Sequence, residues 1–412
     1  MHPAEDIRGT RGSSLEGKKI VLAITGSIAA VECVKLAREL IRQGADVFGV
    51  MTEKAQEIVG AYSIEFATGN PVVTDITGKV EHVEMCGDLS GHADLVLVAP
   101  ATANTIGKMV HGIDDTPVTT FLTTAVGTGI PVLVVPAMHK TMYDHPVVRN
   151  NIEKAKRELG VRFVAPILEE RKAKMAGVEE IVENVIRVLG KGELTGKKVL
   201  IITGATREPL DDMRFLSNRA TGRTGIELGR AAYRMRADVL ILSGSNVCGI
   251  PDHLPFRTFS NTDDLLSMVE GLGRDWGGPD MAFFSAGISD YSPEVSTGKL
   301  PSGQERMTIS MSRTPKVIER FRSLFPDSFL VGFKAESVSD ENELIKRAYE
   351  RMGEVGMDLV VANDLSDVSE DKNTIMLITP QKEVFRAEGK KEHIAQFIIE
   401  RSLSLSGNGK QR

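Results

Sequence analysis

Polar residues directly follow four short apolar segments in the first half of the chain, and their types suit the binding of an anionic ligand. Gly26-Ser27 follows residues 20–24, Thr52 follows 47–51, the run 100–105 follows 95–98, and the run 136–139 follows 132–135. Glycine, serine and threonine at the start of a helix offer hydroxyl and backbone N–H groups to a phosphate. Any one of them alone is typical of an ordinary helix cap, so the prediction of a ligand site depends on all four occurring together.

The apolar segments predict the scaffold that brings these residues together. Each is short, continuously apolar and rich in β-branched residues, which is typical of a strand buried on both faces of a parallel sheet. Helical patterns at residues 28–42 and 178–189 indicate the crossover connections of such a sheet. Ligands of open parallel sheets bind outside the carboxyl ends of the strands, and this is where the polar residues lie.

The second half of the chain restarts the same pattern. Residues 196–204 repeat the order Gly-Lys-Lys, apolar run, Thr-Gly that is found at 17–26, and further strand patterns follow at 239–242, 282–284, 329–333 and 359–361. Since a domain has roughly 100 to 200 residues, the 412 residues predict two Rossmann-like three-layer α/β domains, residues 1–190 and 191–412. A helical pattern begins directly after Gly26, whereas polar residues 205–209 follow Gly204, so we expect the two domains to bind different ligands.

Composition excludes several classes of function. A net charge of −6 with interspersed acids and bases gives no electrostatic basis for binding nucleic acid or an anionic membrane. Three cysteines (Cys33, Cys86 and Cys248) are too few for a disulfide framework, and no apolar run approaches the length of a transmembrane helix. Residues 1–14 lack the apolar centre of a signal peptide. We therefore expect a cytoplasmic protein that acts on small molecules.

The motifs of the first half resemble those of the flavin-binding cysteine decarboxylases. The matching residues are 26–30 (Gly-Ser-Ile-Ala-Ala), 100–105 (Pro-Ala-Thr-Ala-Asn-Thr) and 136–138 (Pro-Ala-Met). The resemblance implies a flavodoxin-like flavoprotein domain with FMN as its cofactor. The phosphate of FMN would lie at Gly26 and Ser27 with Thr52 nearby. Its isoalloxazine ring would be held by the 101–105 loop, which supplies Ala101, Thr102, Ala103 and Thr105.

The same resemblance implies a set of catalytic residues. His82 stands where the family carries its catalytic histidine, and Asn104 is a suitable hydrogen-bond donor to the substrate carboxylate. His139 replaces an asparagine of the family motif and Tyr143 replaces a tryptophan. The bacterial enzymes carry a proton-donating cysteine in a clamp after this motif, but residues 169–178 contain no cysteine. Which group takes its place, Cys86 or another, stays open.

The motifs of the second half resemble those of phosphopantothenate–cysteine ligase. They comprise residues 206–211 (Thr-Arg-Glu-Pro-Leu-Asp), 217–222 (Ser-Asn-Arg-Ala-Thr-Gly), 286–291, 331–333 and 358–364. Together the two resemblances follow the order of the fused decarboxylase–ligase of coenzyme A biosynthesis. Such an enzyme activates 4′-phosphopantothenate as an acyl-nucleotide, releases pyrophosphate and lets L-cysteine attack.

For the ligase the resemblance implies Asn218 and Lys299 as catalytic residues, with Asn218 stabilising an oxyanion. The expected nucleotide contacts are Gly204, Ala286, Asp290, Lys299, Pro315, Phe333, Arg347 and Arg351. Mg²⁺ is expected with the triphosphate, with Asp290 as its ligand. Arg347 and Arg351 share one helix face at i, i+4 spacing, which suits a solvated face equally well. CTP and ATP are both possible nucleotides.

Two other functions compete with this interpretation. A dinucleotide oxidoreductase would need a Gly-x-Gly-x-x-Gly turn, and neither half has one. An active ligase joined to a first half with an altered or regulatory role is the stronger alternative, because the clamp cysteine is missing. In either case the resemblance implies a homo-oligomer, with trimeric contacts in the decarboxylase and dimeric contacts in the ligase.

Overall fold

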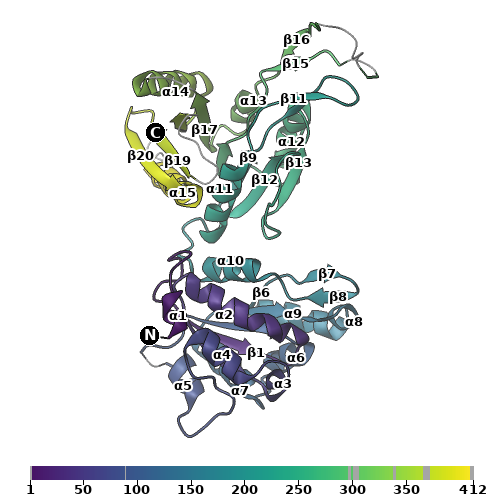
Figure 1. Ribbon diagram of the computed structural model, residues 1–412, viewed down its shortest axis with the longest axis vertical. Helices are drawn as coiled ribbons and strands as arrows, with labels where there is room; N and C mark the ends of the chain where they lie inside the picture. The colour runs from purple at the N-terminus through teal and green to yellow at the C-terminus, as the bar shows by residue number, and fades with distance from the viewer. Residues whose placement is uncertain are drawn as a thin grey trace. The chain divides into compact units, whose positions relative to one another are not determined.

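The computed structural model describes residues 2–88, 90–295, 298–299, 306–336, 340–364 and 372–408. The chain forms two compact units, residues 1–190 and 191–412 (Figure 1). Each unit is built around a mainly parallel sheet with helices on both faces, so the predicted α/β class is confirmed for both. In the described part of the chain, no helix is both long and apolar enough to cross a membrane.

The sheet of the first unit has the flavodoxin-like strand order. Its strands are β1 (Lys19–Ile24), β2 (Asp46–Met51), β3 (Leu95–Ala101), β4 (Val132–Pro136) and β6 (Arg162–Phe163). They lie in the order β2-β1-β3-β4-β6, all parallel, with Leu22 of β1 opposite Gly49 of β2 and Leu97 of β3. The strand order reverses between β1 and β3, which makes their carboxyl ends the topological switch point.

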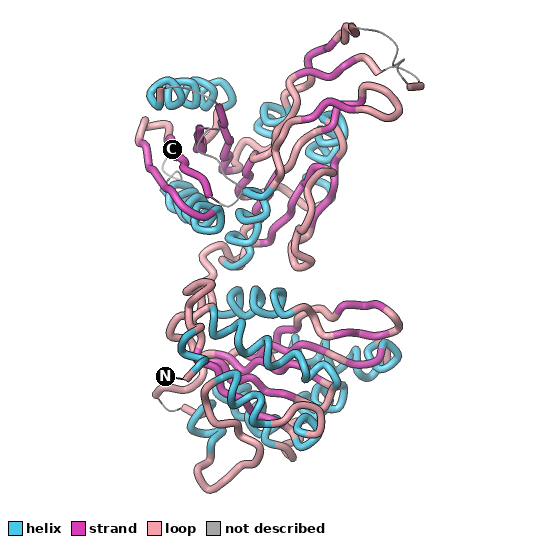
Figure 2. The backbone as a smooth tube through the Cα atoms, in the orientation of Figure 1, coloured by secondary structure: helices cyan, strands magenta, loops and turns pink. Residues whose placement is uncertain are grey.

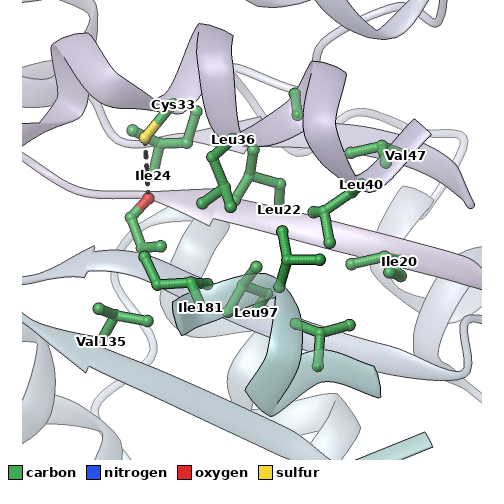
Figure 3. Close-up of a cluster of buried hydrophobic side chains, with 14 of the residues drawn as sticks. Ile20, Leu22, Ile24, Cys33, Leu36, Leu40, Val47, Leu97, Val135 and Ile181 are labelled. Atoms are coloured by element: carbon green, nitrogen blue, oxygen red, sulfur yellow. Dashed lines mark hydrogen bonds between the residues drawn. The ribbon is translucent and has the colours of Figure 1, made fainter. Parts of the chain in front are cut away.

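Helices cover both faces of this sheet. They are α1 (Pro3–Asp6), η1 (Ile28–Glu32), α2 (Cys33–Arg42), α3 (Glu53–Gln56), α4 (Ala61–Thr68), α5 (Glu81–Cys86), α6 (Ala103–His111), α7 (Pro117–Thr128), α8 (Lys140–Tyr143), α9 (Pro146–Glu158) and α10 (Val178–Leu189). Alternate residues of β1 face opposite ways, and Figure 3 shows Leu22 and Ile24 packed with Leu36 of α2 and Ile181 of α10. Val21 and Ala23 pack on the other side, against α6 and α7. The helix predicted for 28–42 begins as a 3₁₀ turn, and α2 proper starts at Cys33.

The sheet of the second unit has the classical Rossmann strand order with an antiparallel extension. It contains β13 (Phe256–Phe259), β12 (Asp238–Gly244), β9 (Lys198–Thr203), β14 (Met281–Phe284), β17 (Phe329–Glu336), β18 (Leu359–Asp364), β19 (Lys372–Ile378) and β20 (Val384–Lys390), in that spatial order. The first six strands are parallel and the last two form the predicted hairpin. Here the order reverses between β9 and β14.

The helices of the second unit again cover two faces, as the tube in Figure 2 shows. They are α11 (Arg223–Arg234), α12 (Thr262–Asp275), α13 (Val317–Leu324), α14 (Glu341–Val355) and α15 (Lys391–Asn408). Val199 and Ile201 of β9 pack with α11 and α15, while Leu200 and Ile202 pack with α12, α13 and α14. Two small ladders, β10 (Arg207–Pro209) with β11 (Phe215–Ser217) and β15 (Tyr291–Pro293) with β16 (Met311–Arg313), stand outside the main sheet.

Gly225 lets α11 pack directly on the end of β9, and this contact can be tested. A Cβ at Gly225 would lie 2.3 Å from Cβ of Thr203, whereas a Cβ at Gly353, inside α14, would meet nothing within 4 Å. We expect Gly225→Ala to lower the free energy of unfolding by about 1–3 kcal/mol through overpacking. Gly353→Ala is the matched control and should raise it by about 0.5–1 kcal/mol through helix propensity. Urea unfolding of the full chain measures both, and a stabilised Gly225→Ala variant would contradict the packing.

Candidate functional site

A buried threonine joins the two loops at the switch point of the first unit. Thr25 ends the apolar run of β1 and is 1% exposed. Its Oγ1 donates to the carbonyl oxygen of Pro100 at 2.7 Å and accepts from the N–H of Thr102 at 3.2 Å. The turn that follows β1 and the loop that follows β3 are therefore fixed on two sides of one hydroxyl. This brings the predicted residues 26–27 and 101–105 to the same edge.

The turn after β1 also approaches the start of α3. A Cβ at Gly26 would lie 2.6 Å from Cβ of Lys54, so a larger residue would separate the two turns. Thr52 caps α3, since its Oγ1 accepts from the N–H of Ala55 at 3.2 Å. Ser27 is the N-cap of η1, yet its hydroxyl makes no capping bond and no other hydrogen bond within the described residues. Gly26, Ser27 and Thr52 thus lie together, with the Ser27 hydroxyl open to a ligand.

In the loop after β3, most polar side chains serve the helix that follows. Oγ1 of Thr102 accepts from the N–H of Thr105 at 3.2 Å, and the two hydroxyls lie 3.0 Å apart. Ala101 is buried in β3 and Ala103 begins α6. Asn104 is exposed, and its amide has no hydrogen-bond partner in the part of the chain that is described. Asn104 is therefore the side chain of this loop that a ligand can engage.

His82 packs against α7 in the first unit. It belongs to α5, and its ring meets Phe121 of α7 edge-on with centroids 6.5 Å apart. Its Nδ1 is buried without a hydrogen-bond partner in the described residues. Among those residues, no hydrogen bond or ring contact connects His82 to Gly26 or Asn104.

His139 borders the stretch that lacks the clamp cysteine. It lies in β5 (Met138–His139), which pairs with β8 (Lys172–Lys174), and β8 pairs with β7 (Ile167–Glu169). His139 stands opposite Lys172 in this ladder, and the N–H of Lys140 donates to the carbonyl of Arg171 at 3.0 Å. Nζ of Lys174 lies 2.7 Å from a Glu169 carboxylate oxygen and 2.9 Å from one of Glu170. The stretch is thus a β-hairpin fastened to the loop after β4.

At the switch point of the second unit, the turns after β9 and β14 continue the sheet. The N–H of Gly287 donates to the carbonyl of Gly204 at 2.8 Å, and the N–H of Thr206 donates to the carbonyl of Gly287 at 3.2 Å. Oγ1 of Thr206 also accepts from the N–H of Ser289 at 3.0 Å. These bonds bring the predicted residues Gly204 and Ala286 to one edge.

Asn218 reaches the same edge from the β10–β11 hairpin. A Cβ at Gly287 would lie 3.0 Å from Cβ of Asn218, so the asparagine covers the turn after β14. The acidic residues of the motif at 206–211 build this hairpin. Oε1 of Glu208, which is buried, accepts from the hydroxyl of Thr262 at 2.6 Å, and Oδ1 of Asp211 accepts from the N–H groups of residues 213 and 214 at 2.8 and 2.7 Å.

Sequence reasoning predicted Gly204 as a nucleotide contact but gave no role to two further glycines of the second site, Gly222 and Gly225. Gly222 and Gly204 both have positive φ, +81° and +86°, and Gly225 permits the close approach of α11 to β9. A tight turn, a close backbone approach and helix–strand packing are the roles of the three glycines in a dinucleotide fingerprint. Residues 205–221 separate the first glycine from the other two here, which hid the pattern. The spacing Gly222-x-x-Gly225 before a helix was the available signal.

Only some of the other predicted residues of the second unit lie near one another. The N–H of Thr314 donates to the carbonyl of Asp290 at 3.0 Å, and Lys316 forms an ion pair with the Asp290 carboxylate, so Pro315 lies near this turn. Phe333 is half-buried against the core on β17. Lys299 is exposed, and residues 300–305 of its loop lie outside the described residues. Among the described residues, no three His, Cys, Asp or Glu side chains gather as a metal site.

Both predicted arginines of α14 have carboxylate partners. Arg347 binds Glu343 at 2.8 Å and Glu336 at 3.1 Å, and Arg351 binds Glu354 at 2.9 Å and Glu319 at 3.1 Å. The hydrogen bond that Arg347 donates to the Glu343 carboxylate raises the pKa of Arg347. This is the geometry of a solvated helix face, and a role in nucleotide binding stays a prediction.

Comparison with known proteins identifies both halves of the chain. Residues 9–190 match the Flavoprotein family, and residues 194–405 match the DNA/pantothenate metabolism flavoprotein C-terminal domain. The chain is 47% identical over 382 residues to the coenzyme A biosynthesis bifunctional protein CoaBC of Thermococcus kodakarensis, which covers 92% of this chain and 93% of that one. It is 36% identical over 408 residues to CoaBC of Methanocaldococcus jannaschii, covering 98% of each.

The chain belongs to the CoaBC family. A crystal structure of the DNA/pantothenate metabolism flavoprotein from Streptococcus pneumoniae is also similar, with 23% identity and a TM-score of 0.46 over 50% of this chain and 99% of that one. The resemblance stated for the two halves is confirmed. The protein is an enzyme with phosphopantothenate–cysteine ligase and phosphopantothenoylcysteine decarboxylase activities.

Neither cysteine of the decarboxylase half of this CoaBC chain is placed as a proton donor. Cys86 ends α5 inside an apolar cluster at 0% exposure, and burial raises the pKa of its thiol to about 12. Cys33 is equally buried, its Sγ lies 3.1 Å from the carbonyl oxygen of Ala99, and burial raises the pKa of its thiol to about 12 as well. A thiol enclosed by aliphatic side chains cannot reach an intermediate at the carboxyl edge without local opening.

We therefore expect Cys86→Ala to keep full conversion of phosphopantothenoylcysteine to phosphopantetheine. Its cost should be confined to stability, about 1 kcal/mol for the lost buried sulfur. Mass spectrometry of the products from flavin-loaded enzyme measures this, with Cys33→Ala as the matched control. Accumulation of the decarboxylated but still oxidised product by Cys86→Ala alone would show that Cys86 donates the proton.

Proposed function

We propose that residues 191–412 join 4′-phosphopantothenate to L-cysteine with a nucleoside triphosphate, and that residues 1–190 decarboxylate the product with FMN. The observation that carries this proposal is the difference between the two switch points. In the first unit β1 leads directly into η1 at Gly26-Ser27, while in the second a hairpin carrying Asn218 is inserted before α11. The first edge suits a compact phosphate cradle, and the second adds an amide that can act on an acyl group.

The residues of the first edge fit FMN. Gly26 lets the turn after β1 approach Lys54 closely, and the free Ser27 hydroxyl and the backbone near Thr52 can hold the phosphate of FMN. When bound, FMN supplies the two-electron oxidation of the substrate thiol and the later return of the electrons, which provides the electron sink that decarboxylation needs. Asn104 would donate a hydrogen bond to the departing carboxylate, and His82 would accept the thiol proton.

His82 can act at that edge if the site is completed by a second copy of the chain. Exposed apolar side chains stand beside both parts of the site: Ile28 follows Ser27 and is 77% exposed, and Val83 follows His82 and is 37% exposed. Apolar residues at such positions favour burial against another subunit. We propose a homo-oligomer with trimeric contacts in this half.

In the ligase half, a carboxylate oxygen of phosphopantothenate attacks the α-phosphorus of the nucleotide and pyrophosphate leaves. The cysteine amine then attacks the acyl carbon and the nucleoside monophosphate leaves. The Asn218 amide is placed to stabilise the oxyanion of the second step, and the backbone at Gly204 and Ala286 borders the nucleotide. Mg²⁺ would arrive with the triphosphate and take Asp290 as a protein ligand, because Mg²⁺ commonly uses one or two carboxylates together with phosphate oxygens.

The ligase half also carries apolar residues on its outlying ladders. Met213 and Phe215 of the β10–β11 hairpin are 70% and 49% exposed, and Met311 of β16 is 42% exposed. We propose that these ladders make the dimeric contacts of the ligase. CTP and ATP both remain candidates as the nucleotide.

The flavin assignment is tested by Ser27→Ala. Loss of a hydrogen bond to a charged phosphate should weaken FMN binding about tenfold or more. Titration of apo-protein with FMN, followed by flavin fluorescence, measures the change. Ser14→Ala, at an exposed serine in the N-terminal loop, is the control and should bind FMN like the unmodified protein. Equal affinities of the two variants would contradict a phosphate site at Ser27.

The ligase assignment is tested by Asn218→Ala. Removal of the oxyanion donor of the second step should lower kcat for formation of phosphopantothenoylcysteine by about 10²–10³-fold. The same variant should decarboxylate supplied phosphopantothenoylcysteine at an unchanged rate, and Asn104→Ala should show the reverse pattern. If the unmodified enzyme released no pyrophosphate with CTP, ATP or any other nucleoside triphosphate, the ligase proposal would fail.

A further inference from the structure

The turn after β12 carries an asparagine that none of the predicted motifs contains. Asn246 and Val247 follow the last residue of the strand, Gly244, by two and three positions. Both side chains are half-buried. They point back toward the switch point from the side opposite the turn after β14.

The amide of Asn246 connects two segments that border the proposed nucleotide site. Its Oδ1 accepts from the N–H of Ala205 at 3.0 Å, and its Nδ2 donates to the carbonyl of Ala220 at 2.7 Å. Ala205 follows the first glycine of the site, and Ala220 lies midway between Asn218 and Gly222. The Asn246 side chain thus holds the turn at Ala205 and the segment at Ala220, which follows Asn218, to the end of β12.

The glycines of the site are packed around these two residues. A Cβ at Gly204 or Gly222 would lie 2.5 or 2.4 Å from Cγ2 of Val247. A Cβ at Gly244 would lie 2.7 Å from Oδ1 of Asn246. These glycines therefore serve a second purpose beyond the turn itself: they admit the Asn246-Val247 pair.

The loop from Thr221 to Arg223 borders a cavity. A cavity of about 470 Å³ lies on its outer side and is lined by Thr221, Arg223, Asn246 and Cys248, among others. A loop that faces a cavity gains no support from close packing on that side. On this side, the two hydrogen bonds of Asn246 and the contact with Val247 support the loop.

We propose that Asn246 is a positioning residue of the ligase reaction. It holds Ala220 so that the Asn218 amide and the start of α11 at Gly222 keep the spacing that the nucleotide and the acyl group require. This inference rests on the proposed ligase function. Only an amide supplies an acceptor to Ala205 and a donor to Ala220 at once; a carboxylate of the same shape would set an oxygen against the Ala220 carbonyl.

The test uses Asn246→Asp in the full-length protein, with pyrophosphate release measured against CTP and ATP. We expect the KM for the nucleotide that is used to rise at least tenfold and kcat to fall about tenfold. Decarboxylation of supplied phosphopantothenoylcysteine should be unchanged. Asn373→Asp, which makes the same exchange at a buried asparagine of β19, is the control for a merely structural effect and should leave the nucleotide KM unchanged.

A second variant, Asn246→Leu, keeps the size of the side chain and removes both hydrogen bonds. Its Ala205 N–H should exchange with solvent deuterium faster than in the unmodified protein, and this readout does not depend on activity. Unchanged nucleotide KM and kcat in Asn246→Asp, together with a strong loss in Asn218→Ala, would overturn the positioning role while leaving the ligase function intact. Absence of pyrophosphate release in the unmodified protein would overturn both.

Discussion

The geometry of both sites depends on a buried threonine hydroxyl at the end of the first strand. Thr25 binds the Pro100 carbonyl and the Thr102 N–H, and Oγ1 of Thr203, which is 0% exposed, donates to the carbonyl of Gly222 at 3.1 Å. A β-branched residue suits the buried end of a parallel strand, and its hydroxyl forms hydrogen bonds with backbone groups of a second loop. The threonine of each Thr-Gly pair therefore ties the end of a strand to a second segment, and that segment differs between the two units.

What each threonine fixes explains why two related sheets do different chemistry. At Thr25 the partner loop belongs to the neighbouring strand β3, so the hydroxyl spans the switch point between β1 and β3. At Thr203 the partner is the start of α11. Along the chain, the β10–β11 hairpin lies between β9 and α11. The first arrangement leaves a narrow edge between two strands. The second leaves a loop that begins with Asn218 directly after β11, and Asn246 adds support to that loop.

The sequence predicted the parts of the fold that depend on local pattern. The continuous apolar runs of β1 and β9 identify strands with two buried faces, and residues 374–386 identify the terminal hairpin, because period and turn chemistry are local. The sequence offered helix capping only as an alternative to ligand binding for Thr102, whose hydroxyl accepts from the N–H of Thr105 at the start of α6. The spacing Gly222-x-x-Gly225 was visible in the sequence, but its link to Gly204 and the Asn246 bridge were not predictable, since these partners lie 18 to 41 positions apart and depend on tertiary approach. Likewise, Glu208 and Asp211 are residue types that often take part in catalysis, yet here the Glu208 carboxylate binds the start of α12 and the Asp211 carboxylate binds the turn between β10 and β11.

The charges around the second edge limit how a triphosphate can be held there. Lys316 is paired with Asp290, and Arg347 and Arg351 each bind two glutamates, so these cations are already neutralised. A phosphate that displaced one of those carboxylates would exchange one ion pair for another, which gains little at a solvated surface. Beside the expected contact Lys299, the specific part of the proposed binding would then come from fixed dipoles: the backbone N–H groups at Gly204 and at the start of α11, whose N-cap Gly222 has no side chain to occupy them. Because such dipoles act only at the right distance and angle, the alignment of the Gly204 and Gly222 segments matters more to this site than the number of basic residues near it.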